Sequence, residues 1–297
     1  MNNNQKCGFI SIIGAPNAGK STLMNKIIGS KVSIVTPKVQ TTRTRITGIT
    51  VKGDAQLVFI DTPGIFLPKK RLDKAMVKAA WQGDSGVDYT ILLVDAKRGI
   101  CKNTMLVAEG LKNSPTKKIL VLNKIDLVAK QGLLELSEAL HKEIDFEKSF
   151  MISAKAGKGV EDIVEYLANN SSDGHWMYPE DQVSDISSRL LASEVTREKL
   201  MLMMNNEIPY KLTVDTESYD ESKREIKINQ VIYVTSENYK KMIVGKQGAT
   251  IKKIGEMARK ELSWMMEKKV HLFLFVKVKE NWLDSKEHYQ QMGLEFR

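Results

Sequence analysis

Residues 14–21 read Gly-Ala-Pro-Asn-Ala-Gly-Lys-Ser, a spacing of glycine, lysine and hydroxyl side chains that suits the binding of a phosphate chain. They follow an apolar, strand-like run at 7–13 and open a helical pattern at 20–28. In that context the glycines let backbone N–H groups and the helix N-terminus approach the phosphates. Lys20 is expected to reach the β- and γ-phosphates, and Ser21 to ligate Mg²⁺. The predicted nucleotide contacts here are Gly14, Ala15, Pro16, Asn17, Ala18, Gly19, Lys20 and Ser21.

A second candidate lies at 61–64, where Asp-Thr-Pro-Gly ends another strand-like run. Asp61 is suited to hold Mg²⁺ through a water, and the amide of Gly64 to meet the γ-phosphate. These residue types are also common in plain strand-ending turns, but their place after a phosphate loop favours a nucleotide site. The predicted contacts are Asp61, Thr62, Pro63, Gly64 and Ile65.

Asn-Lys-Ile-Asp at 123–126 has the residue types that recognise a nucleotide base through hydrogen bonds. A carboxylate can accept hydrogen bonds from N1–H and the 2-amino group of guanine, neither of which adenine offers. Asp126 is therefore expected to select guanine, since the wrong base would leave the carboxylate unpaired. Asn123 is expected to tether neighbouring loops, and the stem of Lys124 to cover the ring. The predicted contacts are Asn123, Lys124, Ile125 and Asp126.

Ser-Ala-Lys at 153–155 ends the next strand-like run, and the N–H of Ala154 is placed to donate to the guanine oxygen. By itself this tripeptide is more typical of an ordinary turn. Ser153, Ala154 and Lys155 complete the predicted nucleotide contacts.

Short β-branched runs alternate with amphipathic helical stretches over residues 7–168. This alternation predicts a mostly parallel sheet with helices on both faces, an α/β domain. One antiparallel hairpin is expected at 45–61, with its turn near Gly53. Each of the four motifs follows a predicted strand, and the carboxyl edge of such a sheet is where ligands bind.

The pattern changes at 169–188, which is polar and rich in Gly, Pro and Ser, as linkers are. Beyond it the predicted order is helix, strand, strand, helix, helix, strand, which fits a smaller α+β domain with three strands. We therefore expect a domain at 1–170, a linker at 171–188 and a second domain at 189–297.

Val-Gly-Lys-Gln-Gly at 244–248 lies between two predicted helices of the second domain. It lacks the spacer, the hydroxyl residue and the preceding strand of a nucleotide loop. A Gly-x-x-G turn between helices instead lets a nucleic-acid backbone approach, which is the signature of KH domains. The predicted RNA contacts are Gly245, Lys246, Gln247, Gly248, Lys252 and Lys253. Trp264 and Tyr239 are suited to base stacking, but core packing is the expected role of both.

The positive charge is concentrated around this loop. The chain carries a formal charge of +9, and residues 238–279 hold eleven Lys or Arg against three Glu, a net +8. A local basic stretch predicts a polyanionic partner, either nucleic acid or an anionic membrane, although it also fits a solvated lysine-rich surface. No apolar run approaches the roughly 20 residues of a bilayer span, and no signal peptide is recognisable. Two cysteines favour a reducing cytosol.

Residues 8–168 resemble a GTPase domain, because the four motifs match four of its five guanine-nucleotide elements in order. The fifth is a threonine of the first switch, for which the sequence offers Thr41 and Thr42. Era-like GTPases match best at Thr42, so the resemblance implies Mg²⁺ bound by Ser21, Thr42 and Asp61. GTP and GDP are the implied ligands.

Catalysis in this family needs an oriented water and positive charge near the β–γ bond. Ras-like GTPases place a Gln directly after the Asp-x-x-Gly motif, but Ile65 stands there in this chain. A slow intrinsic rate is therefore expected. In GTPases with the same loop an asparagine at this position helps hold K⁺, which makes Asn17 a candidate K⁺ ligand; its presence in a loop turn is the plainer explanation. The expected catalytic residues are Lys20, Thr42, Gly64 and Asn17.

The order of the two domains, a GTPase followed by a type II KH domain, is similar to that of the Era family along nearly the whole chain. That resemblance implies a GTP-driven switch that binds the 3′ region of 16S rRNA and assists 30S subunit assembly. It also implies a cytoplasmic protein with peripheral association at the inner face of the cell membrane, and we expect a monomer. The alternative is a membrane-associated signalling GTPase whose basic C-terminal face binds anionic lipid. An RNA-modifying enzyme is a third reading, but no second catalytic constellation supports it.

Overall fold

The computed structural model describes residues 5–84, 86–205 and 207–296, and the chain divides into two compact units. The N-terminal unit holds Met1–Ser33, Thr42–Asp185 and Met292–Arg297, and the C-terminal unit holds Ile34–Thr41 and Ile186–Gln291. This division differs from the predicted limits of 1–170, 171–188 and 189–297, because residues 171–185 of the predicted linker fall in the N-terminal unit. Residues 34–41 make their contacts with the second unit, and residues 292–296 make theirs with the first.

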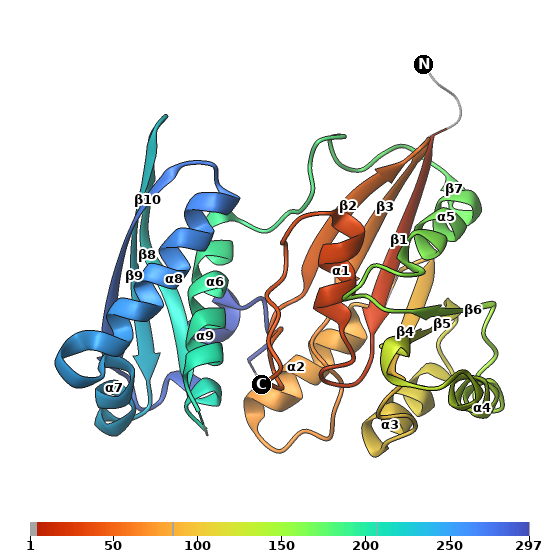
Figure 1. Cartoon of the computed structure of the whole chain (residues 1–297), viewed down its shortest axis with the longest axis horizontal. Coiled ribbons are helices and arrows are strands. Elements are labelled where there is room, and N and C mark those ends of the chain that lie inside the picture. The colour runs from red at the N-terminus through yellow and green to blue at the C-terminus, as the bar shows by residue number, and fades with distance from the viewer. Residues whose placement is uncertain (1–4, 85, 206, 297) are drawn as a thin grey trace. The chain divides into compact units, whose positions relative to one another are not determined.

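Helices alternate with strands in the N-terminal unit, as the sequence pattern predicts (Figure 1). Its strands are β1 (Lys6–Ile13), β2 (Ile46–Lys52), β3 (Ala55–Asp61), β4 (Tyr89–Asp95), β5 (Lys117–Asn123), β6 (Lys148–Ile152) and β7 (Ser172–Asp173). Its helices are α1 (Lys20–Ile28), α2 (Arg71–Gln82), α3 (Lys102–Leu111), η1 (Ile125–Leu127), α4 (Lys130–His141) and α5 (Val160–Asn170).

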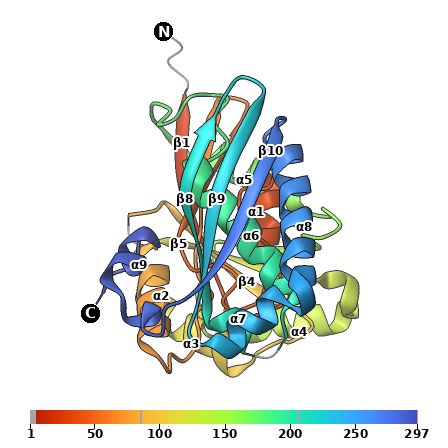
Figure 2. The same ribbon diagram turned by 90° about the vertical axis from the view of Figure 1, so that its left-hand side faces the viewer.

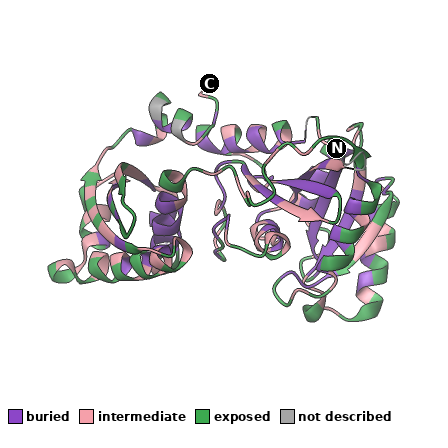
Figure 3. Cartoon of the chain, turned by 90° about the horizontal axis from the view of Figure 1, so that it is seen from above, coloured by how far each residue is buried: buried purple, intermediate pink, exposed green. Residues whose placement is uncertain are grey.

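Within the described residues these strands form one sheet in the order β2-β3-β1-β4-β5-β6, with β7 beside β1. The pairs β1–β3, β1–β4, β4–β5 and β5–β6 are parallel, whereas β2–β3 is the predicted antiparallel hairpin. Successive residues of a strand point to opposite faces, so the continuous apolar runs fill two cores. Ile10 and Ile12 join α1 and α5 on one face, while Ile13 joins α2, α3 and α4 on the other. The central strands are accordingly buried (purple in Figure 3).

The parallel strands all end at one edge of this sheet. The phosphate loop follows β1, Asp61 ends β3, Asn123 ends β5, and Ser153 follows β6. The four sequence motifs therefore meet at one edge although they are spread over some 140 residues.

The C-terminal unit is a smaller α+β structure, shown face-on in Figure 2. Its elements are α6 (Ser188–Met203), η2 (Ile208–Tyr210), β8 (Leu212–Glu221), β9 (Glu225–Val234), α7 (Glu237–Val244), η3 (Lys246–Gly248), α8 (Ala249–Met265), β10 (Lys269–Val278), η4 (Trp282–Asp284) and α9 (Lys286–Gln291). The sheet order is β10-β9-β8, with β8 antiparallel and β10 parallel to β9. Helices α6, α7 and α8 share cores with these strands.

The predicted fold is confirmed: a mostly parallel α/β sheet whose first strand leads into the phosphate loop (P-loop), followed by a smaller α+β unit with the element order expected of a type II KH domain. The sequence pattern did not predict η4 and α9, although both contribute fully buried aromatic residues, Trp282 and Tyr289. Among the described residues no helix is both long enough and apolar enough to cross a membrane.

Candidate functional site

The phosphate loop has the backbone geometry that its glycines allow. Gly19 has a φ of 102°, and Asn17 also adopts a positive φ, of 64°. A Cβ on Gly14 would lie 2.3 Å from the carbonyl oxygen of Leu93, and one on Gly64 would lie 2.9 Å from the Cα of Pro16. Glycine at 14 and 64 therefore lets the loop pack against β4 and against the Asp61–Gly64 turn.

Lys20 lies folded over this loop rather than extended into solvent. Its Nζ donates to the carbonyl oxygens of Gly14 and Ala15 at 3.2 and 3.1 Å, and the side chain is buried. Burial lowers the pKa of Lys20 to about 8, although the nearby Asp61 carboxylate acts in the opposite direction. A phosphate chain would replace neutral carbonyl partners with anionic oxygens, which hold an ammonium group more strongly.

Three predicted cation ligands meet at the end of β3. The hydroxyl of Ser21 donates to Asp61 Oδ2 at 2.7 Å and lies 2.9 Å from the hydroxyl of Thr42, which is 3.5 Å from the same carboxylate oxygen. The Thr41 hydroxyl instead lies 2.7 Å from that of Thr36 and donates to the carbonyl of Lys38. Of the two threonines left open by the sequence, the structure brings Thr42 to Ser21 and Asp61.

This oxygen cluster fits Mg²⁺, which prefers hard oxygen ligands. Burial raises the pKa of Asp61, while Lys20 and the hydroxyls of Ser21, Ser33 and Thr42 favour the charged form. The Oδ1 atom of Asp61 is buried and has no hydrogen-bond partner in the described part of the chain. Such an atom is costly to bury unless a cation or a metal-bound water completes its bonding. When bound, Mg²⁺ would neutralise charge on the β- and γ-phosphate oxygens.

Asn123 joins three of the predicted loops. Its Nδ2 donates to the carbonyl of Ala18 at 2.8 Å, and its Oδ1 accepts from the N–H groups of Lys124 and Ala154. This is the expected tether. Asn123 also accepts the hydrogen bond of the Ala154 N–H, which we expected to face the guanine oxygen. The physical reason is that the buried Oδ1 of Asn123 needs both N–H donors.

Lys124 and Asp126 lie at the rim of this edge. Lys124 Nζ donates to the carbonyl of Asn17 and to Asp95 Oδ2, at 2.8 and 2.6 Å. The pKa of Asp126 is lowered chiefly by a hydrogen bond from Ser153. Asp126 is exposed and ionised, as a carboxylate that accepts two donors from a base must be.

Thr62 and Ile65 are placed differently from the other predicted contacts. The Thr62 hydroxyl donates to the carbonyl of Ile12, and the Ile65 N–H donates to that of Gly14. The side chain of Ile65 is fully buried in the core beneath α2 and α3. These two residues hold the turn against β1 and the phosphate loop, and both side chains are fully buried.

Two polar residues of this site carry no motif signature and were not predicted. Ser33, buried, donates to Asp61 Oδ2 at 2.9 Å. Asn25 on α1 fixes that turn, because its Oδ1 accepts from the N–H groups of Val32 and Ser33 and its Nδ2 donates to the carbonyl of Ser33. Neither stands at a position that a spacing rule singles out.

The Gly-x-x-G loop of the C-terminal unit joins α7 to α8. Gly245 has a φ of 73°, and a Cβ there would lie 2.1 Å from the Thr250 hydroxyl oxygen, so no larger residue fits. Gly248 has a φ of 77° with open space around it, and Gln247 also has a positive φ. The loop therefore runs directly into the N-terminus of the 17-residue helix α8, the positive end of whose dipole suits an anion.

Exposed polar side chains surround this loop. Lys246 and Gln247 lie in it, and Lys252 and Lys253 lie in the first turns of α8, all exposed.

Tyr239 packs against the core, as expected, and Lys211 lies 5.3 Å from its ring centroid. The expectation of core packing was wrong for Trp264, which is 75% exposed because it lies on the outer side of α8, away from the buried Leu262.

Comparisons with known proteins agree with both halves of this geometry. Residues 9–124 match the family described as "50S ribosome-binding GTPase", and residues 207–283 match the KH domain family. The chain is 51% identical to GTPase Era of Brucella suis over 98% of its own length and 94% of that protein.

Two solved structures are similar over almost the entire chain. One is Era of Aquifex aeolicus bound to GDP and an aluminium fluoride, with a TM-score of 0.92, 34% identity and coverage of 97% of this chain and 99% of that one. The other is Era in complex with MgGDPNP and nucleotides 1506–1542 of 16S ribosomal RNA, with a TM-score of 0.91, 35% identity and the same coverage.

The base-reading role of Asp126 predicts a change of nucleotide preference. In Asp126→Asn the amide replaces a carboxylate oxygen by a donor, which opposes the guanine 2-amino group and suits the 2-oxygen of xanthine. We expect GTP affinity to fall by roughly 100-fold or more while affinity for xanthosine triphosphate rises. Competition binding with both nucleotides measures this, with Asp162→Asn on α5 as the matched control. An unchanged GTP affinity in Asp126→Asn would contradict the role.

The buried position of Lys20 predicts a pH-dependent stability of the nucleotide-free protein. Its pKa is lowered from 10.5 to about 8 on folding, so between these values the unfolded chain binds more protons and stability rises with pH. Below pH 8 the full destabilisation, at most about 3 kcal/mol, is present. Urea unfolding from pH 7 to 10 should therefore show the stability of the wild type rising with pH relative to that of Lys20→Met.

Lys26→Met, on the exposed side of the same helix, is the control and should follow wild type. Parallel curves for Lys20→Met and wild type at all pH values would show that burial does not shift this lysine.

Proposed function

Because the chain belongs to the Era family of GTPases, we propose that it couples GTP hydrolysis to binding of the 3′ region of 16S rRNA and thereby assists assembly of the 30S subunit. Hydrolysis of GTP by a GTPase domain joined to a KH domain is the family's activity. The RNA partner is argued from the C-terminal loop and from the related Era that was crystallised with nucleotides 1506–1542 of 16S ribosomal RNA.

The observation that carries the RNA proposal is the geometry of residues 245–248. Gly245 has no room for a side chain, Lys246 and Gln247 are exposed, and the loop opens onto the N-terminus of a long helix. Backbone N–H groups and lysines together suit closely spaced phosphates of a single strand. We propose that Gly245, Lys246, Gln247 and Gly248, with Lys252 and Lys253, clamp that strand.

For the nucleotide, we propose that the phosphate loop, the turn at Asp61, Asn123–Asp126 and Ser153–Lys155 surround GTP or GDP. Ser21 and Thr42 would ligate Mg²⁺, and Asp61 would hold it through a water. The support is the convergence of the side-chain oxygens of Ser21, Thr42 and Asp61 within 3.5 Å, together with the buried Asp61 Oδ1.

The domain limits are proposed at 1–170, 171–188 and 189–297. We further propose a cytoplasmic monomer that associates peripherally with the membrane.

Ile65 occupies the position directly after the Asp-x-x-Gly motif, and its side chain is buried in the core. The attacking water must therefore be activated without a glutamine at that position. We propose that K⁺ supplies positive charge near the β–γ bond with Asn17 as a ligand, and that Lys20, Thr42 and the Gly64 amide stabilise the transferred phosphoryl group. The support is the position of Asn17, which holds a positive φ in the phosphate loop and accepts a bond from Lys124 through its carbonyl oxygen.

Replacement of Na⁺ by K⁺ tests the role of Asn17. We expect GTP turnover at least several-fold faster in K⁺ than in Na⁺, and Asn17→Ala should lose that difference while its Na⁺ rate stays near wild type. Steady-state phosphate release at equal ionic strength measures both. Equal wild-type rates in the two salts would remove K⁺ from the mechanism.

Charge reversal in the C-terminal loop tests the RNA proposal. The double variant Lys246→Asp, Gln247→Asp places carboxylates against phosphates, so we expect at least a 10-fold loss of affinity for a single-stranded fragment of the 16S rRNA 3′ region and a shallower salt dependence. GTP hydrolysis should remain. The double variant Ser222→Asp, Lys223→Asp makes the same change of charge in the β8–β9 turn and should bind RNA as wild type does.

The same proteins distinguish the lipid alternative. Sedimentation with vesicles of phosphatidylserine and phosphatidylcholine, at matched salt, measures binding to an anionic surface. Strong vesicle binding by the wild type combined with no detectable RNA binding would favour the membrane-signalling GTPase and overturn the RNA proposal.

A further inference from the structure

Residues Ile34–Thr41 belong to the C-terminal unit by their contacts, although Ser33 and Thr42 on either side belong to the N-terminal unit. Both flanking hydroxyls lie at Asp61 Oδ2, at 2.9 Å for Ser33 and 3.5 Å for Thr42. The segment therefore leaves and re-enters the proposed Mg²⁺ site within ten residues.

The segment is closed on itself by its threonines. The hydroxyls of Thr36 and Thr41 lie 2.7 Å apart, and that of Thr41 donates to the carbonyl of Lys38 at 2.6 Å. These hydrogen bonds hold the backbone of residues 36–41 in one conformation. A hydrogen bond to Thr41 is therefore made to a loop of fixed shape.

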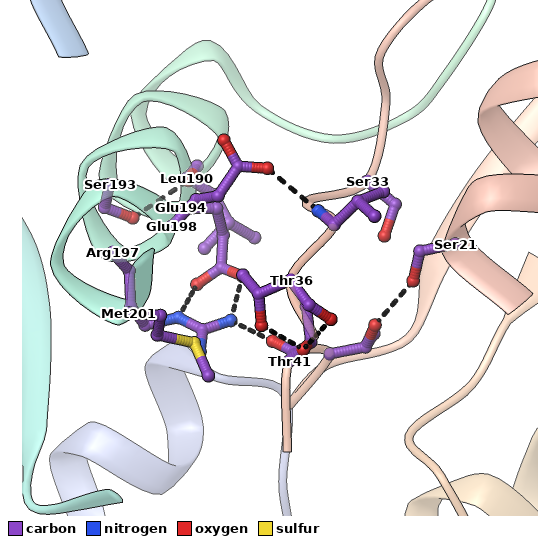
Figure 4. A network of polar contacts seen from close by, with 12 residues as sticks. Ser21, Ser33, Thr36, Thr41, Leu190, Ser193, Glu194, Arg197, Glu198 and Met201 are labelled. Atoms are coloured by element: carbon purple, nitrogen blue, oxygen red, sulfur yellow. Dashed lines mark hydrogen bonds and ion pairs between the residues drawn. The ribbon is translucent and has the colours of Figure 1, made fainter. Parts of the chain in front are cut away.

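Helix α6 holds both ends of this loop (Figure 4). Glu198 accepts a hydrogen bond from the Val35 N–H at 2.9 Å. Arg197 Nη2 donates to the carbonyl oxygen of Thr41. Lys38 Nζ in turn donates to the carbonyl of Met204, just after the end of α6.

Arg197 is itself fixed by a carboxylate. Its Nε and Nη2 donate to the two oxygens of Glu194 at 2.7 and 2.5 Å, a two-point pair, and Nη1 lies 3.2 Å from the sulfur of Met201. The side chain is only 2% exposed. A planar guanidinium held at two points has little rotational freedom. The direction in which Arg197 points its remaining N–H group is therefore fixed by its pairing with Glu194 on the same helix.

The Thr41 carbonyl shares its peptide unit with the N–H of Thr42. That unit is planar and trans, so the C=O and the N–H point in opposite directions. A guanidinium that holds the Thr41 oxygen thereby aims the Thr42 N–H away from α6, while the Thr42 hydroxyl lies with Ser21 and Asp61.

We propose that Arg197 is a positioning residue for GTP hydrolysis, because it orients the Thr41–Thr42 peptide so that Thr42 meets the γ-phosphate and Mg²⁺. Glu194 in turn holds the guanidinium of Arg197 in place. This rests on the proposed role of Thr42. The arginine that holds this peptide lies on α6, the first helix of the C-terminal unit.

Arg197→Lys tests this without leaving the Glu194 carboxylate unpaired, because a lysine keeps the charge but cannot span Glu194 and Thr41 together. Only a triphosphate would reach Thr42, so we expect affinity for GDPNP to fall about 10-fold, the size of one charged hydrogen bond, while affinity for GDP changes less than about twofold. GTP turnover should fall with the GDPNP affinity. Glu194→Gln should act in the same direction.

Arg189→Lys is the matched control on α6. Arg189 also donates to two backbone carbonyls, of Thr216 and Glu217, and should leave the GDPNP-to-GDP affinity ratio unchanged. Amide hydrogen exchange of peptides covering 34–42 gives a readout independent of turnover. GDPNP should protect them in the wild type and in Arg189→Lys, and less in Arg197→Lys.

Thr42→Ala separates the two possible failures. If Thr42→Ala lowers the GDPNP-to-GDP ratio but Arg197→Lys and Glu194→Gln retain the wild-type ratio and protection, the positioning role of Arg197 is overturned. If Thr42→Ala itself retains the wild-type ratio, the proposed function of Thr42 fails, and the inference fails with it.

Discussion

The buried carboxylate of Asp61 is the constraint on which the nucleotide edge depends. A charge at the end of a central strand, removed from water, is tolerated only when donors or cations surround it. Here Ser21, Ser33 and Thr42 bring hydroxyls to one of its oxygens, and Lys20 supplies the nearby positive charge. The cluster therefore connects the phosphate loop with the two residues that flank the segment 34–41, and the other oxygen of Asp61 suits a hard cation.

Asn123 has a similar role at the base-binding end of the edge. One side-chain amide satisfies a carbonyl of the phosphate loop and two N–H groups of later loops. Since an unpaired buried amide is costly, the three loops keep one relative arrangement. Together, Asp61 and Asn123 convert loops that follow separate strands into a single preorganised surface, which is what a phosphoryl-transfer site requires.

The Gly-x-x-G loop of the C-terminal unit differs in structure from the phosphate loop of the N-terminal unit. The Gly-x-x-G loop has two glycines at positive φ, exposed lysines and a helix N-terminus. Such a loop is suited to a backbone that continues in both directions, whereas the first loop encloses the end of a phosphate chain. The same small residues serve both tasks because glycine permits close backbone approach in each case.

Most of the fold and the position of the nucleotide edge could be predicted from the sequence, because local patterns carry them. Strand runs that are apolar on both faces require helices on both sides, and motifs that end such strands must meet at one edge. The Gly-x-x-G loop was predictable for the same reason, since φ > 0 and flanking helical periods are local properties. What local pattern could not decide was which side chains meet across the chain.

The choice between Thr41 and Thr42, the partner of the Ala154 amide, the place of Ser33 and the hold of Arg197 on Thr41 all depend on contacts between residues distant in sequence. The exposure of Trp264 likewise depended on which side of α8 faces the sheet. The local sequence was enough to predict the types of chemistry, two loops suited to phosphate and a motif suited to guanine. Which hydroxyls, amides and charges satisfy one another could be seen only in the folded chain, because burial imposes that requirement on atoms that no spacing rule connects.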